Sequence, residues 1–142
     1  MKQVKQFIVC AIIVNVSISC QFNEAVQAND NTSFSQASIA KDISPEEFQK
    51  LIGDDAIILD VRTKDEYSGG HLEGSVNIDF FSKTFIEEVL KLDRSKSLLI
   101  HCASGGRSSK AMSKLSGSGF KSMYNMLGGY GAWSKSNLPF VK

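Results

Sequence analysis

One of the three cysteines stands where an apolar run ends and a glycine-rich stretch begins. In the segment SLLIHCASGGRSSKAM, the apolar run ends on His101 and Cys102, and the stretch after it contains Gly105, Gly106 and Arg107. Glycine can adopt positive φ, so the N–H groups of such a loop can turn inward and hold an anion. The amino end of the helix expected after this loop adds a partial positive charge. We therefore expect the pKa of Cys102 to be lowered and its thiolate to be the reactive species.

The size of this loop separates the reactions that a cradled thiolate could perform on sulfur, phosphorus or arsenic. Four residues lie between Cys102 and Arg107. Cysteine phosphatases use one residue more, because their loop must wrap the oxygens of a phosphoryl group. The shorter loop makes a smaller bowl, which suits a terminal sulfur atom. The candidate catalytic residue is Cys102, and the candidate substrate-binding residues are Ala103, Ser104, Gly105, Gly106 and Arg107.

Residues 1–19 have the form of a secretory signal peptide. Lys2 and Lys5 make a short basic start, and the apolar run FIVCAIIVNVSIS after them is too short to cross a membrane comfortably. The residues behind this run are polar and show no sustained periodicity, which argues against a buried N-terminal helix. We therefore expect the chain to be exported.

Two processing sites compete at the end of this signal. Cys20 directly after the apolar run resembles the lipidated cysteine of a bacterial lipoprotein, although Ser17 stands where such sites usually carry leucine. Cleavage after Ala28 is the alternative, because it obeys the small-residue rule. We favour the lipoprotein, and we expect a flexible tether over residues 20–38 and a folded domain over residues 39–142. The expected location is the bacterial cell envelope or periplasm, with membrane contact only through the lipid.

Charge and cysteine content exclude several kinds of partner and scaffold. The chain has 16 basic and 15 acidic residues, and 14 of each remain once residues 1–28 are removed. A domain without net charge has no electrostatic footprint for nucleic acid or for an anionic membrane surface. Cys102 is the only cysteine after Cys20, so the folded domain cannot contain an internal disulfide. A lone thiol in an exported domain is a liability unless it is buried or used.

Short apolar runs alternate with helical patterns in the folded part. Residues 56–61 form a continuous apolar run rich in β-branched residues, which predicts a strand buried on both faces of a parallel sheet, and residues 97–102 form another buried-strand run. Two further short strands are predicted over residues 75–78 and 122–127. Helices are predicted over residues 44–53, 81–93, 107–115 and 130–136. The first helix should begin at the N-cap Ser44, with Glu47 completing a capping box. The alternation predicts an α/β fold, an open parallel β-sheet flanked by helices on both faces.

Large apolar side chains in this region are expected to pack in the core. In the helix predicted over residues 81–93, apolar side chains recur at helical spacing and predict a core-facing stripe of Phe81, Phe85, Val89 and Leu92. Trp133 is expected to be buried as well.

Four motifs in the chain resemble those of the rhodanese family of sulfurtransferases. CASGGRS matches the family's active-site loop of cysteine, two variable residues, glycine, one variable residue and arginine. The stretches LDVRTKDEY, GHLEGSVNI and LGGYGAW resemble three further family motifs. All four occur in the family's order and span residues 39–139, which is almost the entire predicted domain. Together they are highly specific.

The resemblance implies a rhodanese-like fold and sulfur transfer through Cys102. The thiolate would attack a sulfane sulfur donor, such as thiosulfate or a persulfide, and carry the sulfur as a cysteine persulfide that cyanide or a thiol then accepts. N–H groups of residues 103–107 would hold the persulfide anion. The resemblance implies no cofactor and no metal, and we expect a monomer. Ala103 departs from several thiosulfate-using members, which carry Lys or Arg there, and this weakens the case for thiosulfate.

Polar residues outside the loop are expected to support the fold. Three charged residues are predicted to form a partly buried ion-pair set that fixes a strand-to-helix turn, namely Asp60, Arg62 and Glu66. His71 is expected to make structural hydrogen bonds. Strand alternation points the side chain of His101 away from that of Cys102. These two histidines, thirty residues apart, make a poor metal site.

Two other functions stay open from the residues alone. A non-catalytic member of the fold could serve as a binding or sulfide-sensing module in the cell envelope, although a purely structural loop would require neither Cys102 nor Arg107. A cysteine phosphatase or arsenate reductase is disfavoured by the four-residue spacing inside the loop. Sulfur transfer is the function that we expect.

Overall fold

The computed structural model describes residues 39–142. The predicted signal, the tether, Cys20 and the alternative cleavage after Ala28 therefore lie outside the described residues. Among the described residues, no helix has the length and hydropathy needed to cross a membrane.

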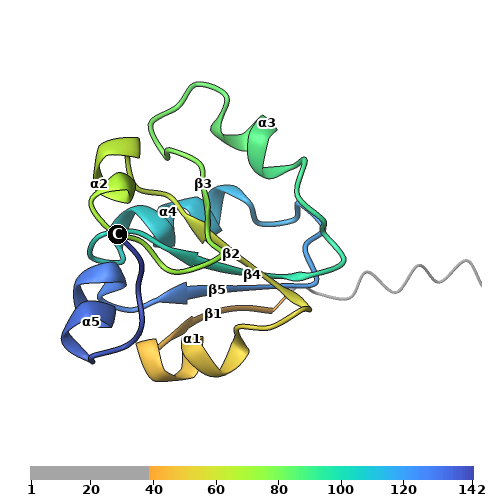
Figure 1. Ribbon diagram of the computed structural model, residues 1–142. Coiled ribbons are helices and arrows are strands. Elements are labelled where there is room, and N and C mark those ends of the chain that lie inside the picture. The colour runs from red at the N-terminus through yellow and green to blue at the C-terminus, as the bar shows by residue number, and fades with distance from the viewer. Residues whose placement is uncertain (1–38) are drawn as a thin grey trace, which may run out of the picture. The chain divides into compact units, whose positions relative to one another are not determined.

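A parallel sheet forms the centre of the fold, as predicted, and it has five strands where four were predicted (Figure 1). Its strand order is β1-β5-β4-β2-β3, and every pairing between these strands is parallel. The strands are β1 Ile39–Ile43, β2 Ala56–Asp60, β3 Val76–Asn77, β4 Ser97–His101 and β5 Ser122–Met126. The helices are α1 Pro45–Leu51, α2 Lys64–Ser68, α3 Phe85–Val89, α4 Gly106–Lys114 and α5 Gly129–Lys135. Parallel strands need such crossovers, and the crossovers cover both faces of the sheet.

Two apolar clusters lie on opposite faces of this sheet. One cluster joins α3 and α4 to the sheet, and it includes Phe85, Ala111 and Cys102. The other joins α1 and α5 to the sheet through Phe48 and Trp133. Trp133 is 1% exposed, which confirms its predicted burial. Each face of the sheet is therefore covered by two helices, and loops lie at the carboxyl ends of the strands.

The predicted capping box at the start of α1 is confirmed. The hydroxyl of Ser44 accepts a hydrogen bond from the N–H of Glu47, and the Glu47 carboxylate accepts one from the N–H of Ser44. Pro45 is the first helical residue. The helix ends at Leu51, two residues before Gly53. A second capping box, formed by Thr63 and Glu66, begins α2.

Several features differ from the prediction, among them helix α2, which was not predicted, and α3, which ends at Val89. Strand β1 was not predicted, because its sequence IAKDI contains no continuous apolar run and all its residues but Ile43 are exposed at the sheet edge. The core-facing stripe is wrong at Phe81, which is 67% exposed. The helix begins only at Phe85, so Phe81 lies in the preceding turn and Phe80 packs against Phe85 instead, with ring centroids 5.5 Å apart.

Candidate active site

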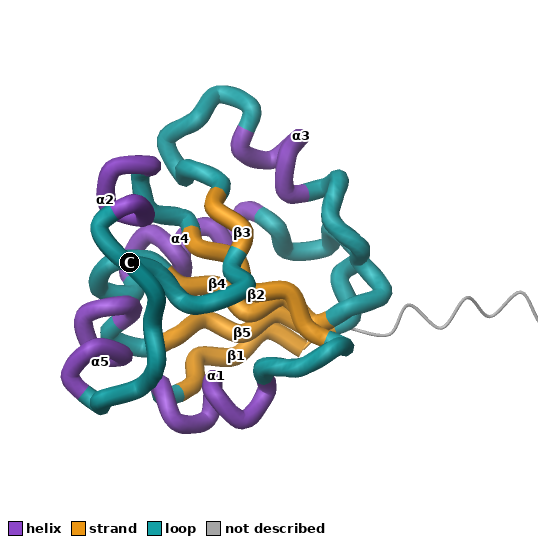
Figure 2. The backbone as a smooth tube through the Cα atoms, viewed as in Figure 1, coloured by secondary structure: helices purple, strands orange, loops and turns teal. Residues whose placement is uncertain are grey.

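The loop that follows β4 lies between the loops that follow β2 and β5 (Figure 2). Strand β4 ends at His101, Cys102 comes next, and the chain enters α4 at Gly106. In open α/β sheets this edge, beyond the carboxyl ends of the strands, is where ligands bind. Cys102 is 1% exposed, so its sulfur lies at the base of the loop rather than on the surface.

The sulfur of Cys102 accepts hydrogen bonds from its own loop and from α4. The N–H of Gly105 lies 3.1 Å from Sγ, and the hydroxyl of Ser108 lies 3.5 Å from it. Gly105 adopts a φ of +94°, which turns its N–H inward. Gly106, in contrast, is already the first residue of α4, so only one of the two glycines uses the left-handed conformation expected of the loop.

These contacts determine the charge of the thiol. Burial of Cys102 raises its pKa, but hydrogen bonds from Ser108, Ser104 and Gly105 lower it, and the net pKa is below the ordinary value. The direction expected from the sequence is therefore confirmed. A thiolate held by N–H and O–H donors can act as a nucleophile at neutral pH.

The amino end of α5 holds the outer side of the same loop. The N–H of Tyr130 donates to the carbonyl of Cys102 at 2.7 Å, and the N–H of Gly131 donates to the carbonyl of Ala103 at 3.0 Å. Gly129 packs directly on this loop, since a Cβ there would lie 2.8 Å from the Ser104 nitrogen and would collide with the carbonyl oxygen of Cys102. The loop carbonyls thus face α5, which leaves loop N–H groups available to the sulfur.

Arg107 at the far end of the loop pairs with Glu66 of α2. Its two terminal nitrogens donate to the two carboxylate oxygens of Glu66 at 2.8 and 2.7 Å. This hydrogen bonding lowers the pKa of Glu66 to about 2 and raises that of Arg107. The guanidinium also lies 5.7 Å from the ring centroid of Phe81. The sequence prediction that placed Glu66 in one ion-pair set with Asp60 and Arg62 is therefore wrong in its partner, because α2 turns Glu66 towards α4.

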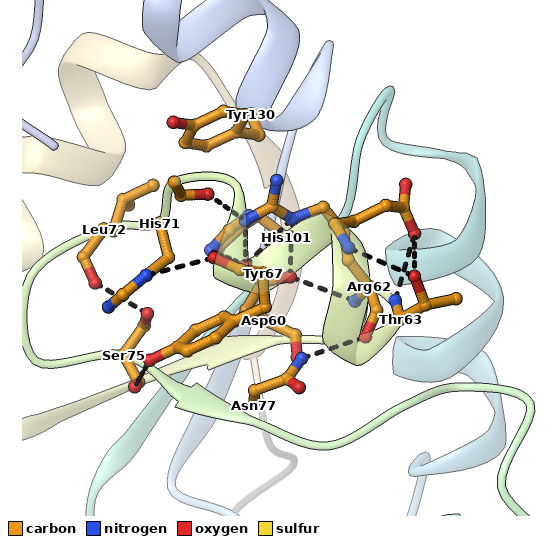
Figure 3. Close-up of polar contacts among 12 residues, drawn as sticks. Asp60, Arg62, Thr63, Tyr67, His71, Leu72, Ser75, Asn77, His101 and Tyr130 are labelled. Atoms are coloured by element: carbon orange, nitrogen blue, oxygen red, sulfur yellow. Dashed lines mark hydrogen bonds and ion pairs between the residues drawn. The ribbon is translucent and has the colours of Figure 1, made fainter. Parts of the chain in front are cut away.

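Asp60 and Arg62 form the predicted buried ion pair on their own (Figure 3). The guanidinium of Arg62 donates to Asp60 at 2.6 and 2.9 Å and to the carbonyl of Gly70 at 2.8 Å. It also lies 4.1 Å from the ring centroid of Tyr130, and Figure 3 shows Tyr130 above Arg62. The pair fixes the turn between β2 and α2. Because Arg62 contacts the ring of Tyr130, it also supports the residue whose N–H donates to the carbonyl of Cys102.

Neither histidine is placed to act on Cys102. His101 packs beside Phe48 on the opposite face of the sheet, as alternation predicts, and burial lowers its pKa to about 4. His71 stacks on Tyr67 with ring centroids 3.9 Å apart, and its Nδ1 lies 3.1 Å from the carbonyl of Tyr67. Within residues 39–142, no group of three or more His, Cys, Asp or Glu side chains is arranged to hold a metal ion.

Sequence reasoning missed two contributors to the site. Ser108 follows Arg107 directly, and its position in the first turn of α4 was the available signal, because a hydroxyl there faces back towards the loop. Gly129 lies in the stretch LGGYGAW, and its contact with the loop was not predicted. The structure gives this glycine a φ of +56° and a close contact with the active-site loop, which no pattern in the sequence indicates.

Comparison with known proteins finds similar proteins by family, by sequence and by structure. The family described as rhodanese-like domain matches residues 44–136. The chain is 37% identical over 91 residues to thiosulfate sulfurtransferase 16, chloroplastic, of Arabidopsis thaliana, covering 57% of this chain and 76% of that protein. It is 30% identical over 93 residues to thiosulfate sulfurtransferase GlpE of Ectopseudomonas mendocina, covering 66% of this chain and 84% of that protein. A solved rhodanese-related protein from Thermoplasma volcanium superposes with a TM-score of 0.64 at 29% identity, covering 71% and 97% of the two chains.

Proposed function

The chain belongs to the family of rhodanese-like domains, and on this premise we propose that it is a sulfurtransferase that carries sulfur on Cys102. The observation that carries the proposal is the environment of the Cys102 sulfur, which accepts hydrogen bonds from the Gly105 N–H at 3.1 Å and from the Ser108 hydroxyl at 3.5 Å. These donors lower the pKa of the thiol. The names of the similar plant and bacterial proteins support the same reaction class.

The reaction proceeds in two displacements at sulfur. In the first, the Cys102 thiolate attacks the sulfane sulfur of the donor. A new S–S bond forms, the donor's own bond to that sulfur breaks, and its electron pair leaves with sulfite or with a thiolate. In the second, cyanide or an acceptor thiolate attacks the outer sulfur, and the Cys102 thiolate is released. No net oxidant or reductant is consumed within either step.

The loop and α4 stabilise the charged states of this cycle. The negative charge lies on the Cys102 sulfur before the first step and on the outer sulfur of the persulfide after it. The inward-facing N–H groups of the loop and the Ser108 hydroxyl hold this charge, as the donors of an oxyanion hole do. The hydrogen bonds from Tyr130 and Gly131 hold the carbonyls of Cys102 and Ala103 towards α5.

Sulfur uptake and release test this function. The full chain is incubated with thiosulfate or with a persulfide, and then with cyanide, while thiocyanate release is measured beside a Cys102→Ser control. Intact mass measures whether the chain gains one sulfur atom. We expect thiocyanate and the added mass with at least one donor, and neither in the control. A chain that takes up sulfur from no donor would instead be a non-catalytic binding or sulfide-sensing module.

We also propose that the domain works in the bacterial cell envelope. This part rests on the signal-like sequence of residues 1–19 and on Cys20. Mass analysis of the mature amino terminus in a bacterial host checks it, since a lipidated Cys20 and a free residue 29 differ in mass and in partition into detergent. An unprocessed amino terminus would contradict export.

A further inference from the structure

The carboxylate of Glu66 is fixed in place from two sides. One of its oxygens accepts hydrogen bonds from the N–H and the hydroxyl of Thr63, each at 3.0 Å. Both of its oxygens accept from Arg107. With a pKa of about 2, Glu66 stays ionised at every pH at which the site could work. The ion pair between Glu66 and Arg107 is thus held in a defined position at the edge of the active-site loop.

This pairing changes what Arg107 offers to a substrate. Arg107 ends the active-site loop and is close enough to Cys102 for the charge of the thiolate to raise its pKa further. Yet its two terminal nitrogens are directed at Glu66, so the pair has no net charge. Ala103, the residue after the cysteine, is uncharged. The donors on the sulfur itself, a backbone N–H and a hydroxyl, suit one negative charge.

We propose that Glu66 sets the donor preference of the site, because its negative charge offsets Arg107 and favours singly charged donors over dianionic ones. Persulfides and organic thiosulfonates carry one negative charge on the reacting group, whereas thiosulfate carries two. The second charge of thiosulfate comes to the rim of the loop, where Glu66 offsets the attraction that Arg107 would otherwise exert on it. This inference rests on the proposed sulfur transfer and names its donor class. Glu66 is a positioning residue here, since it acts through Arg107.

Two donors of nearly equal shape test the idea. In methanethiosulfonate a methyl group replaces one oxygen of thiosulfate, so the two anions differ by one unit of charge. The full chain and its Glu66→Gln variant are compared for kcat/KM with each donor, with cyanide as acceptor. Gln keeps the capping oxygen of α2, and it removes the charge together with one of the two hydrogen bonds from Arg107. We expect the ratio of thiosulfate to methanethiosulfonate kcat/KM to rise about three- to tenfold, mainly through KM, for one charge removed near a partly exposed site.

The chain supplies a matched control for this substitution. Glu47 has the same capping role at α1 that Glu66 has at α2, but its hydrogen-bond partner is Ser44 and α1 lies against the opposite face. Glu47→Gln should leave the donor ratio unchanged. Glu66→Asp, which keeps the charge, should keep a ratio near that of the natural chain. A shift of equal size in Glu66→Asp or in Glu47→Gln would overturn the proposal, because it would trace the effect to the helix cap.

Alkylation of Cys102 measures the charge at the site without sulfur transfer. Iodoacetate is anionic and iodoacetamide is neutral, so the ratio of their rates reports the local potential at the sulfur. We expect Glu66→Gln to raise this ratio several-fold, and an unchanged ratio would overturn the proposal. A chain that takes up sulfur from neither of these donors nor from a persulfide refutes the proposed function, and the donor preference falls with it. Sulfur transfer with an unchanged donor ratio in Glu66→Gln refutes the donor preference alone.

Discussion

Gly129 gives the sharpest test of how the active-site loop is held. Its φ is +56°, and a Cβ at this position would lie 2.8 Å from both the carbonyl carbon of Ala103 and the nitrogen of Ser104. Real Cβ atoms do not approach backbone atoms this closely. In Gly129→Ala, either the loop or the amino end of α5 must therefore move. Since that end donates to the carbonyl of Cys102 at 2.7 Å, the movement reaches the catalytic residue.

The expected cost of Gly129→Ala has two parts. A left-handed φ costs alanine about 1–2 kcal/mol. Forcing a methyl group against fixed backbone adds about 1–3 kcal/mol. Gly117 supplies the control, because its φ is +76° but nothing lies within 4 Å of a Cβ built on it. Gly117→Ala should lose only the first part, and urea unfolding measures the difference between the two variants.

Activity separates a disturbed loop from a merely weaker fold. We expect Gly129→Ala to transfer sulfur at least about tenfold more slowly than the natural chain, and Gly117→Ala to stay close to it. The pKa of Cys102, taken from the pH dependence of iodoacetamide alkylation, should rise in Gly129→Ala because the Gly105 N–H shifts from the sulfur. Equal losses of stability in both variants, with an unchanged rate and pKa in Gly129→Ala, would refute the role assigned to this contact.

Two further predictions concern the hydroxyl on the sulfur and the buried imidazole. Ser108→Ala removes a donor that lowers the pKa of Cys102, so this pKa should rise and alkylation at neutral pH should slow several-fold, as a pH series with iodoacetamide would show. His101 has a pKa of about 4 when folded, against 6.5 for an ordinary histidine, so the unfolded chain binds the extra proton first and stability should fall as the pH drops from about 6.5 towards 4. Neither ring nitrogen of His101 has a hydrogen-bond partner among the described residues. We expect His101→Leu to reduce the difference in unfolding free energy between pH 7 and pH 5, measured by urea unfolding. An unchanged difference would contradict the role given to His101.

The elements that could be predicted are those with a strong local pattern. Strands β2 and β4 contain continuous apolar runs because both of their faces are covered, and the start of α1 could be predicted from Ser44 and Glu47. The lowered pKa of Cys102 also follows from local features, since its donors lie within six residues of it. Strand β1 has no such pattern, because at the sheet edge its pairing comes from the backbone alone. Phe81 was wrongly predicted to face the core, because its spacing to Phe85 is helical although the helix begins only at Phe85.

Predicting the partner of Arg107 would have required the register of the sheet, because no local sequence pattern indicates it. Strands β2 and β4 are parallel neighbours, and Asp60 pairs with His101 at their carboxyl ends. Glu66 follows Asp60 by the same number of residues as Arg107 follows His101. Each strand leads through a short turn into a helix at the same edge, so equal offsets bring the two side chains together. Interpreting Glu66 as a partner of Arg62 used only closeness in sequence, whereas the charge of the active site depends on closeness across the register.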